Sequence, residues 1–353
     1  MKLKILINYL IFCFLTILII FSLSKIIYIN KNYFEANLLK TIYYDIKPNS
    51  IDVLVIGPST AETAWNPLVA WKECGITSLN YSFSNLPISI VKNIITDFLK
   101  RQKPKVILID VNSLVSYNIN GGNGRKYFFY YIFHKIPFSV NKIKILNTLT
   151  KYYNLNLEDF ICSIFPLIAT HDNAFLDNIK QDGLCLAYMR KQYFNRNNIY
   201  SNISYTTMSK FQEDNVPMEY LEDLFNFCKK LDIPVVFIGV PTPLFFTKPY
   251  NTIPMRHRYD SFFSLIKERN FDYINANQYY AIRDLKLSYR DGSDSDHLNF
   301  WGSKKFTKYI SKIIAERYNL EDKKNNPDYS FWNETTDKYI KDVKEKCGVK
   351  ISI

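Results

Sequence analysis

The sequence lacks the motifs that mark most metal and cofactor sites. Its six cysteines form no CxxC pair and no Cys/His spacing of a zinc site. His134, His171 and His257 have no metal-ligand spacing either. No G-x-G-x-x-G motif follows the first predicted strand, and no Walker loop occurs. These absences argue against a dinucleotide-binding protein and a P-loop NTPase, and we expect neither a metal nor a cofactor.

A disulfide framework is also missing. Cys13 lies in an N-terminal apolar run, and the other five cysteines are scattered and odd in number. Buried free thiols are the default interpretation. A single bridge outside the cell stays open.

Nucleic-acid-binding motifs are absent although the chain is basic. Lysine and arginine outnumber the acidic residues by 45 to 33, which gives a net charge of +12, and the lysines are dispersed among other residue types. We therefore expect an anionic membrane or a cell-surface polymer as partner, and no nucleic acid. A hydrophobic content of 47% with 22% charged residues predicts a folded chain with a sizeable core.

The N-terminus carries one long apolar run but no cleavage site. Lys2 and Lys4 precede Ile5–Leu23, which is close to the ~20 residues that span a bilayer as a helix, and no Ala-x-Ala site follows. We interpret residues 1–24 as an uncleaved transmembrane signal anchor and residues 25–50 as a juxtamembrane segment. The positive-inside rule favours a single-pass protein of the cell membrane with an extracytoplasmic globular domain. Lys25, Lys31 and Lys40 follow the apolar run and weaken this charge asymmetry, so the inverted orientation stays an alternative.

Alternating strand and helix signals fill residues 51–320. Short apolar runs predict buried strands at 53–56, 105–111 and 234–240, and residues 78–83 and 271–275 read as a second strand and a short last strand. Helical spacing predicts helices at 61–71, 88–101, 218–231, 259–270 and 301–318. Strands joined by helices with short loops predict an α/β domain, a parallel sheet flanked by helices.

Two regions depart from this alternation. Residues 113–217 contain a Gly-rich loop at 121–124 and aromatic-rich helical segments without a β period. We interpret them as a mostly helical insertion that covers the site. Residues 321–353 form a charged C-terminal tail, for which Trp332 and Ile340 are candidate anchors onto the body.

Ser59 follows the first predicted strand directly after Gly57-Pro58. A serine at a strand-to-helix turn stands at the carboxyl edge of the sheet, where sites of α/β proteins are usually built. The turn exposes the hydroxyl, and the start of the following helix offers backbone N–H groups to a developing negative charge. The alternative is that Ser59 simply caps the helix.

A second polar constellation lies near the end of the domain, in Asp291–Phe306. His297 stands before the last predicted helix, and Asp294 precedes it by three residues. At this spacing on a turn a carboxylate can reach Nδ1 of the imidazole, which leaves Nε2 free to accept a proton from a hydroxyl. The alternative is a solvated acidic loop in which Asn299 caps the next helix.

Together these two ends resemble the SGNH (GDSL-like) hydrolase superfamily, in particular its membrane-anchored bacterial branch. There the opening reads like DVLFLGSSH…NP and the close like D-x-x-HLN-x-x-G-x-x-x-FT. Here the matching stretches are Asp52–Pro67 and Asp294–Thr307. The resemblance runs from about Ile51 to the tail and implies an SGNH-type, flavodoxin-like sheet. It further implies that Ser59 is the nucleophile, His297 the base and Asp294 the orienting acid.

The oxyanion hole departs from the family pattern. Pro58 replaces a serine and has no backbone N–H to donate, and Thr60 replaces a frequent histidine. Ser82 stands where the family usually has a glycine, and Asn112 follows the third strand without the usual Gly-x-Asn-Asp surroundings. The resemblance nevertheless makes the Ser82 backbone N–H and Asn112 the candidate oxyanion donors. Losing one donor typically costs ~10²–10³ in rate.

Three hypotheses follow from these residues. The first is an extracytoplasmic, membrane-tethered acyl esterase or O-acyltransferase that acts on a cell-surface polysaccharide or another acylated polymer of the cell envelope. The second is a catalytically degenerate member that binds glycan or docks a multispanning membrane acyltransferase. The third is a protein of inverted topology on the cytoplasmic face.

Overall fold

A computed structural model of the chain describes residues 2–30, 46–84, 86–112, 133, 136, 139–153, 155–158, 218–247, 253–294 and 296–347. Most of the insertion predicted at 113–217 lies outside the described residues, including its Gly-rich loop and the histidines at 134 and 171. Part of the predicted juxtamembrane segment, residues 31–45, lies outside them as well.

The centre of the fold is a parallel five-stranded sheet. Its strands are β1 (Val53–Ile56), β2 (Ser78–Asn80), β3 (Val106–Asp110), β4 (Val235–Gly239) and β5 (Asp272–Asn275). They lie in the order β2-β1-β3-β4-β5, and all neighbours run parallel. The expected α/β domain with a parallel sheet is thus confirmed. This order reverses between β1 and β3, and such a switch point is where open α/β sheets usually bind ligands.

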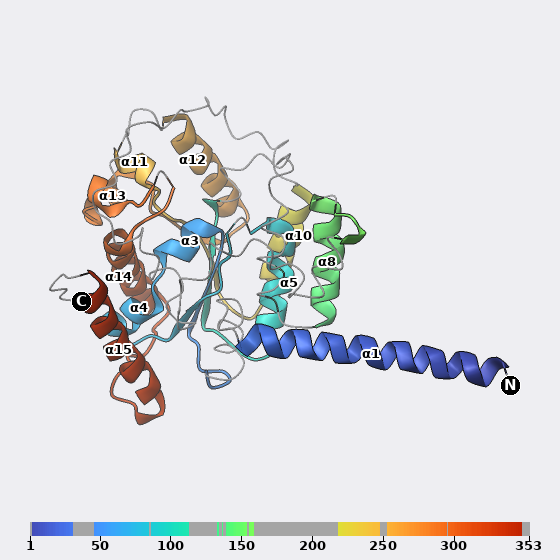
Figure 1. The fold of residues 1–353 in the computed structure, drawn as a ribbon. Helices are drawn as coiled ribbons and strands as arrows, with labels where there is room; N and C mark the ends of the chain where they lie inside the picture. Colours follow the sequence, from blue (N-terminus) through green and yellow to red (C-terminus); the bar gives the residue numbers. More distant parts are fainter. Residues whose placement is uncertain are drawn as a thin grey trace.

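Helices cover both faces of this sheet, as Figure 1 shows. The helices of the α/β body are α3 (Ser59–Ala64), α4 (Pro67–Cys74), α5 (Ile88–Leu99), α8 (Val140–Tyr153), α10 (Met218–Lys229), α11 (Pro243–Thr247), α12 (Ile253–Glu268), α13 (Tyr279–Asp284) and α14 (Phe300–Arg317), with the 3-10 turn η7 (Tyr289–Asp291). Helices α5, α8 and α10 pack together on one side, whereas α3, α4 and α14 pack together on the other.

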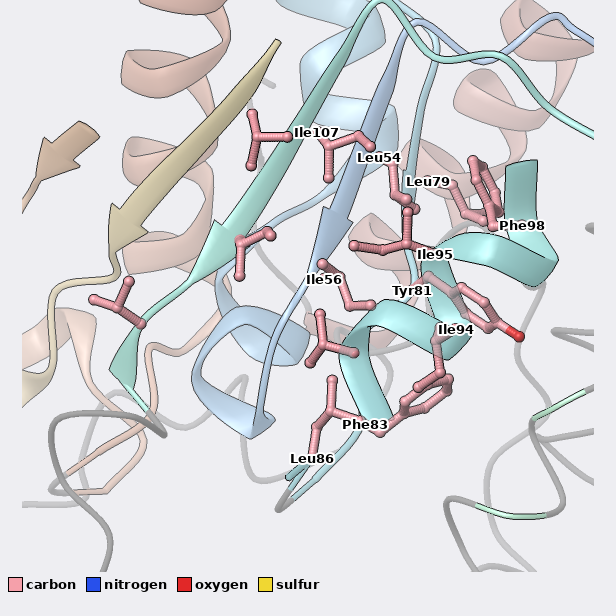
Figure 2. Close-up of a cluster of buried hydrophobic side chains, with 14 of the residues drawn as sticks. Leu54, Ile56, Leu79, Tyr81, Phe83, Leu86, Ile94, Ile95, Phe98 and Ile107 are labelled. Carbon is pink, nitrogen blue, oxygen red and sulfur yellow. The ribbon is translucent and has the colours of Figure 1, made fainter. Parts of the chain in front are cut away.

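Buried apolar residues alternate between the two faces of each central strand. In β1, Leu54 and Ile56 join the core beneath α5, while Val53 and Val55 join the core beneath α14. Figure 2 shows the first of these cores, where Leu54 and Ile56 meet Ile94 and Ile95 of α5. Because both faces are covered, the strands read as continuous apolar runs rather than alternating ones.

The structure differs from the helix expected at 61–71. Two helices replace it, since α3 ends at Ala64 and α4 begins at Pro67. Asn66 accepts hydrogen bonds from the N–H groups of Leu68 and Val69 and so caps α4, and Pro67 takes the first helical position, where its missing N–H costs nothing. The apolar pattern runs across this break because every residue from Thr60 to Trp71 is buried.

The C-terminal region packs onto the body. After the 3-10 turn η8 (Pro327–Tyr329), α15 (Ser330–Cys347) lies against α4, and Trp332 is buried with its ring 5.6 Å from that of Trp71. Ile340 is only partly buried. Lys323 also reaches the start of the sheet, where its Nζ lies 2.7 Å from Asp52 Oδ2 and both side chains are buried.

The N-terminal helix α1 (Lys2–Asn30) contains the apolar stretch Leu3–Leu23, 21 residues that are long and apolar enough to cross a membrane. Its large apolar side chains are exposed, so no protein surface covers them in the described part of the chain. The helix is compatible with a membrane anchor or a signal sequence.

Candidate active site

Ser59 stands on the first turn of α3, immediately after β1 and the turn Gly57-Pro58. Its side chain is half-buried. Strand β1 borders the switch point of the sheet, so Ser59 lies at the edge where a ligand would bind. The N–H groups in the first turn of a helix have no carbonyl acceptor within that helix. The backbone N–H of Ser59 is therefore a hydrogen-bond donor available close to the Ser59 hydroxyl.

His297 and Asp294 converge on this hydroxyl. The Nε2 atom of His297 lies 2.8 Å from Ser59 Oγ, across 238 positions of sequence. Its Nδ1 atom lies 2.7 Å from both carboxylate oxygens of Asp294. An ionised carboxylate can only accept, so Nδ1 carries the proton that it donates to Asp294, and Nε2 of the neutral ring accepts from the serine. The three residues therefore lie in the order of a Ser-His-Asp triad.

A tight turn holds the acid against the ring. Besides Nδ1, Asp294 Oδ1 accepts the backbone N–H groups of Asp296 and His297, at 2.9 and 2.8 Å. These backbone hydrogen bonds hold the carboxylate in place, and the carboxylate in turn orients the imidazole. Asp296 is exposed.

Asn299 and Gly302 join this loop to helix α14. Asn299 Oδ1 caps the helix by accepting the N–H groups of Trp301 and Gly302, and its Nδ2 donates to the carbonyls of Arg290 and Gly292. Gly302 packs against the carbonyl of Asp291, in a space that a Cβ atom would fill. The Asn and Gly that follow the histidine therefore fix the position of the loop rather than touch the hydroxyl.

The same helix also fastens the two ends of the domain together. Thr307 Oγ1 accepts the backbone N–H of Asn66 at 2.9 Å and donates to the Ala64 carbonyl at 3.0 Å. Ser303 Oγ donates to the same carbonyl. The end of α3 is thus bonded to the helix that follows His297, which sets the distance between nucleophile and base.

Charges near His297 change its pKa. Burial by itself lowers the pKa of the imidazole, but the hydrogen bond and negative charge of Asp294, with the charges of Asp296 and Glu62, more than offset it, so the pKa lies above its ordinary value of 6.5. Burial raises the pKa of Asp294, and the hydrogen bond and charge of His297 outweigh that effect, so its pKa lies below 3.8. Asp294 is therefore ionised at neutral pH.

The expected oxyanion residues lie around the site without a demonstrated role. Ser82 is buried beside the Gly57 turn, since Phe83 N–H donates to the Gly57 carbonyl, and the Ser82 hydroxyl has no hydrogen-bond partner in the described residues. Asn112 is buried, with Nδ2 donating to the Val240 carbonyl and Oδ1 accepting from the Tyr259 hydroxyl. These bonds give Asn112 a part in joining the loops after β3 and β4 to α12. Both oxyanion assignments stay predictions.

Two buried acids near Ser59 were not singled out by the sequence patterns. Glu62 accepts the Ser84 hydroxyl at 2.8 Å, and Asp110 Oδ2 accepts the Thr60 hydroxyl at 2.5 Å. Asp110 ends an otherwise apolar strand, which was the available signal. Within the described residues, no group of three or more His, Cys, Asp and Glu side chains could hold a metal ion.

No family model and no curated protein matches this chain. Among solved structures, it is similar to a gut microbial diltiazem-metabolizing enzyme with a TM-score of 0.38 and 10% sequence identity. The similarity covers 78% of this chain and 48% of that one, so the chain spans about half the length of that enzyme. A likeness this weak carries no argument about function, which has to come from the geometry of the site.

Proposed function

We propose that the chain is a membrane-tethered SGNH-type serine acyl esterase or O-acyltransferase that acts on acylated polymers of the cell surface. The observation that carries this proposal is the pair of contacts from His297, 2.8 Å to Ser59 Oγ and 2.7 Å to Asp294. Side chains so far apart in sequence meet at the edge of a sheet with the donor and acceptor order that nucleophilic catalysis requires.

The chemistry follows from this order. Ser59 Oγ attacks an ester carbonyl while its proton passes to His297 Nε2, and the Asp294 carboxylate stabilises the imidazolium that forms. The proton then moves to the leaving alkoxide, which departs as an alcohol and leaves an acyl group on Ser59. Water or a sugar hydroxyl then gives its proton to His297 and attacks the acyl carbon. The bond from that carbon to Ser59 Oγ breaks, and His297 returns the proton to Ser59 Oγ. Hydrolysis and transfer differ in which of the two acceptors takes the acyl group.

The oxyanion in this scheme needs donors. The backbone N–H of Ser59 is one, because it belongs to the first turn of α3 and Pro58 precedes it as the N-cap residue. The backbone N–H of Ser82 is the second candidate, on the neighbouring strand loop. The alternative function, a degenerate protein that binds glycan or docks a membrane acyltransferase, draws its support from Pro58 and from the side chain at Ser82 where a glycine permits closer approach.

Covalent labelling separates these two functions. The full chain in detergent micelles should react with a fluorophosphonate probe and hydrolyse a p-nitrophenyl acyl ester, and Ser59→Ala should abolish both. Ser264→Ala is the matched control, because this serine lies exposed on α12 and its hydroxyl donates to the Asp260 carbonyl of its own helix. A chain that is folded but inert to the probe would support the degenerate alternative.

The topology rests on the apolar stretch Leu3–Leu23 and on Lys2 and Lys4 at its N-terminal end. We place this helix in the bilayer and the α/β domain outside the cytoplasm. Protease added to intact spheroplasts should degrade the domain. Protection until the membrane is opened would show the inverted orientation.

A further inference from the structure

The residue that follows the nucleophile is bonded to a buried acid. Thr60 Oγ donates to Asp110 Oδ2 at 2.5 Å, and both side chains are buried. Asp110 ends the central strand β3, which is paired with β1. Its position is therefore set by the sheet, whereas Thr60 belongs to the turn that carries Ser59.

The carboxyl group of Asp110 also accepts hydrogen bonds from neighbouring backbone N–H groups. Its Oδ1 accepts the N–H of Asn112 at 3.1 Å and lies 3.5 Å from the N–H of Val240. The backbone N–H of Ala61, two residues after the nucleophile, donates to it as well. One side chain thus joins the nucleophile turn to the loops that follow β3 and β4.

The turn also packs directly against Asp110. A Cβ atom on Gly57 would come within 2.6 Å of Asp110 Cβ and 2.9 Å of Ala61 Cβ, distances that real Cβ atoms do not tolerate. Only glycine leaves room for the turn to lie this close to the acid. The close approach and the hydrogen bonds act on the same few residues.

Helix α3 depends on such contacts for its position. It has six residues, too few to be stable alone in water. The Asn80 side chain donates to the carbonyl of Ala61, within the helix, and to that of Trp65, its C-cap residue. Asp110 fastens the near end, where Ser59 stands.

We propose that Asp110 is a positioning residue for Ser59, which acts through Thr60 to hold the serine hydroxyl on His297. The inference rests on the proposed function only for its kinetic consequences. Burial raises the pKa of Asp110 from 3.8 to about 7, so its carboxylate is costly to keep in this place. Buried acids with a strongly shifted pKa cluster at functional sites, where they hold neighbouring groups in place.

The test compares two substitutions of Thr60 in the full chain in micelles. Thr60→Val keeps the shape of the side chain but removes the hydroxyl, and Thr60→Ser keeps the hydroxyl. Because a misplacement of about 1 Å can cost 10²-fold, we expect Thr60→Val to lower kcat and the fluorophosphonate labelling rate by about 10- to 100-fold while KM changes less than about twofold. Thr60→Ser should stay within about threefold of the wild type. Circular dichroism establishes that both variants are folded.

A spectroscopic readout decides the question without activity. With ¹⁵N-labelled histidine, Ser59→Ala defines the Nε2 signal of His297 without its serine partner. Thr60→Val should move the wild-type signal toward that position, and Thr60→Ser should leave it in place. A folded Thr60→Val variant with the wild-type Nε2 signal overturns the positioning role.

The two proposals fail in different ways. A wild-type chain that neither labels nor hydrolyses esters contradicts the proposed function, and the Nε2 signal then still decides whether Thr60 and Asp110 position Ser59. Wild-type labelling at Ser59 together with an unchanged kcat in Thr60→Val contradicts the positioning role alone.

Discussion

Asp110→Asn should change the way in which the stability of the protein depends on pH. Asp110 is 2% exposed, and burial raises its pKa to about 7, whereas in the unfolded chain the carboxyl titrates near 3.8. Between these values the folded state binds more protons at this site than the unfolded state does. Its contribution to stability is therefore fully present below about pH 4 and is lost as the pH rises to about 7.

The size of the effect follows from the two pKa values. One pKa unit corresponds to about 1.36 kcal/mol, so the complete loss amounts to ~4 kcal/mol, of which roughly 2–3 kcal/mol falls between pH 5 and pH 8. Asparagine cannot titrate, so this part of the pH dependence disappears in the variant. Other titrating groups, including His297, contribute equally to both proteins and cancel in the comparison.

The measurement is urea unfolding of the full chain in micelles at both pH values. The free energy of unfolding of Asp110→Asn minus that of wild type should be more positive at pH 8 than at pH 5 by about 2–3 kcal/mol, because only the wild type loses stability over this range, and the m-value should be unchanged. Asp223→Asn is the control, because that carboxylate is half exposed and pairs with Lys92 at the surface; it should change this difference by less than about 0.5 kcal/mol. Equal differences at the two pH values would refute the assignment of a raised pKa to Asp110.

Three further predictions concern the candidate active site and the buried ion pair between Asp52 and Lys323. Asp294→Asn should lower kcat for ester hydrolysis by about 10³–10⁴, because an amide neither stabilises the imidazolium nor selects the tautomer. The control Asp296→Asn should keep most of the activity, since it leaves the contact between Asp294 and His297 intact. Activity should rise with pH with a midpoint above 6.5, because only neutral His297 accepts the serine proton and its pKa is raised. Glu62→Gln should lower that midpoint, and a flat pH profile would contradict the role of the imidazole. Asp52→Asn should reduce the free energy of unfolding by about 3 kcal/mol, because it leaves the buried ammonium of Lys323 without its carboxylate; a loss below about 1 kcal/mol in urea unfolding would show that the pair is solvated.

Local patterns in the sequence were enough for the sheet and for the residues of the proposed triad. Apolar runs buried on both faces identify the central strands β1, β3 and β4 regardless of which helices pack on them, which is why the core of the parallel sheet was predictable. The strand before Ser59 and the turn from Asp294 to His297 are both short-range features. Their roles in catalysis stay predictions until the labelling and kinetic experiments are done.

Helix boundaries and the C-terminal region were less accessible to this reasoning. The break between α3 and α4 depends on Asn66, whose cap and whose bond to Thr307 link residues 241 positions apart. The charged tail contains α15, which is stable there because Trp332 packs on Trp71. Periodicity within one segment carries no record of such partners.

The sequence by itself determined the strands and most helices of the α/β domain, and it placed a serine and an Asp-x-x-His turn at opposite ends of that domain. Only the tertiary structure decided that Ser59 Oγ and His297 Nε2 lie 2.8 Å apart, and that Asp110 is bonded to the residue beside the serine. The physical reason is range. Strand and turn preferences act between neighbours in the chain, whereas the distance between two loops is set by strand order, by α14 bonded to the end of α3, and by the burial that keeps both in place.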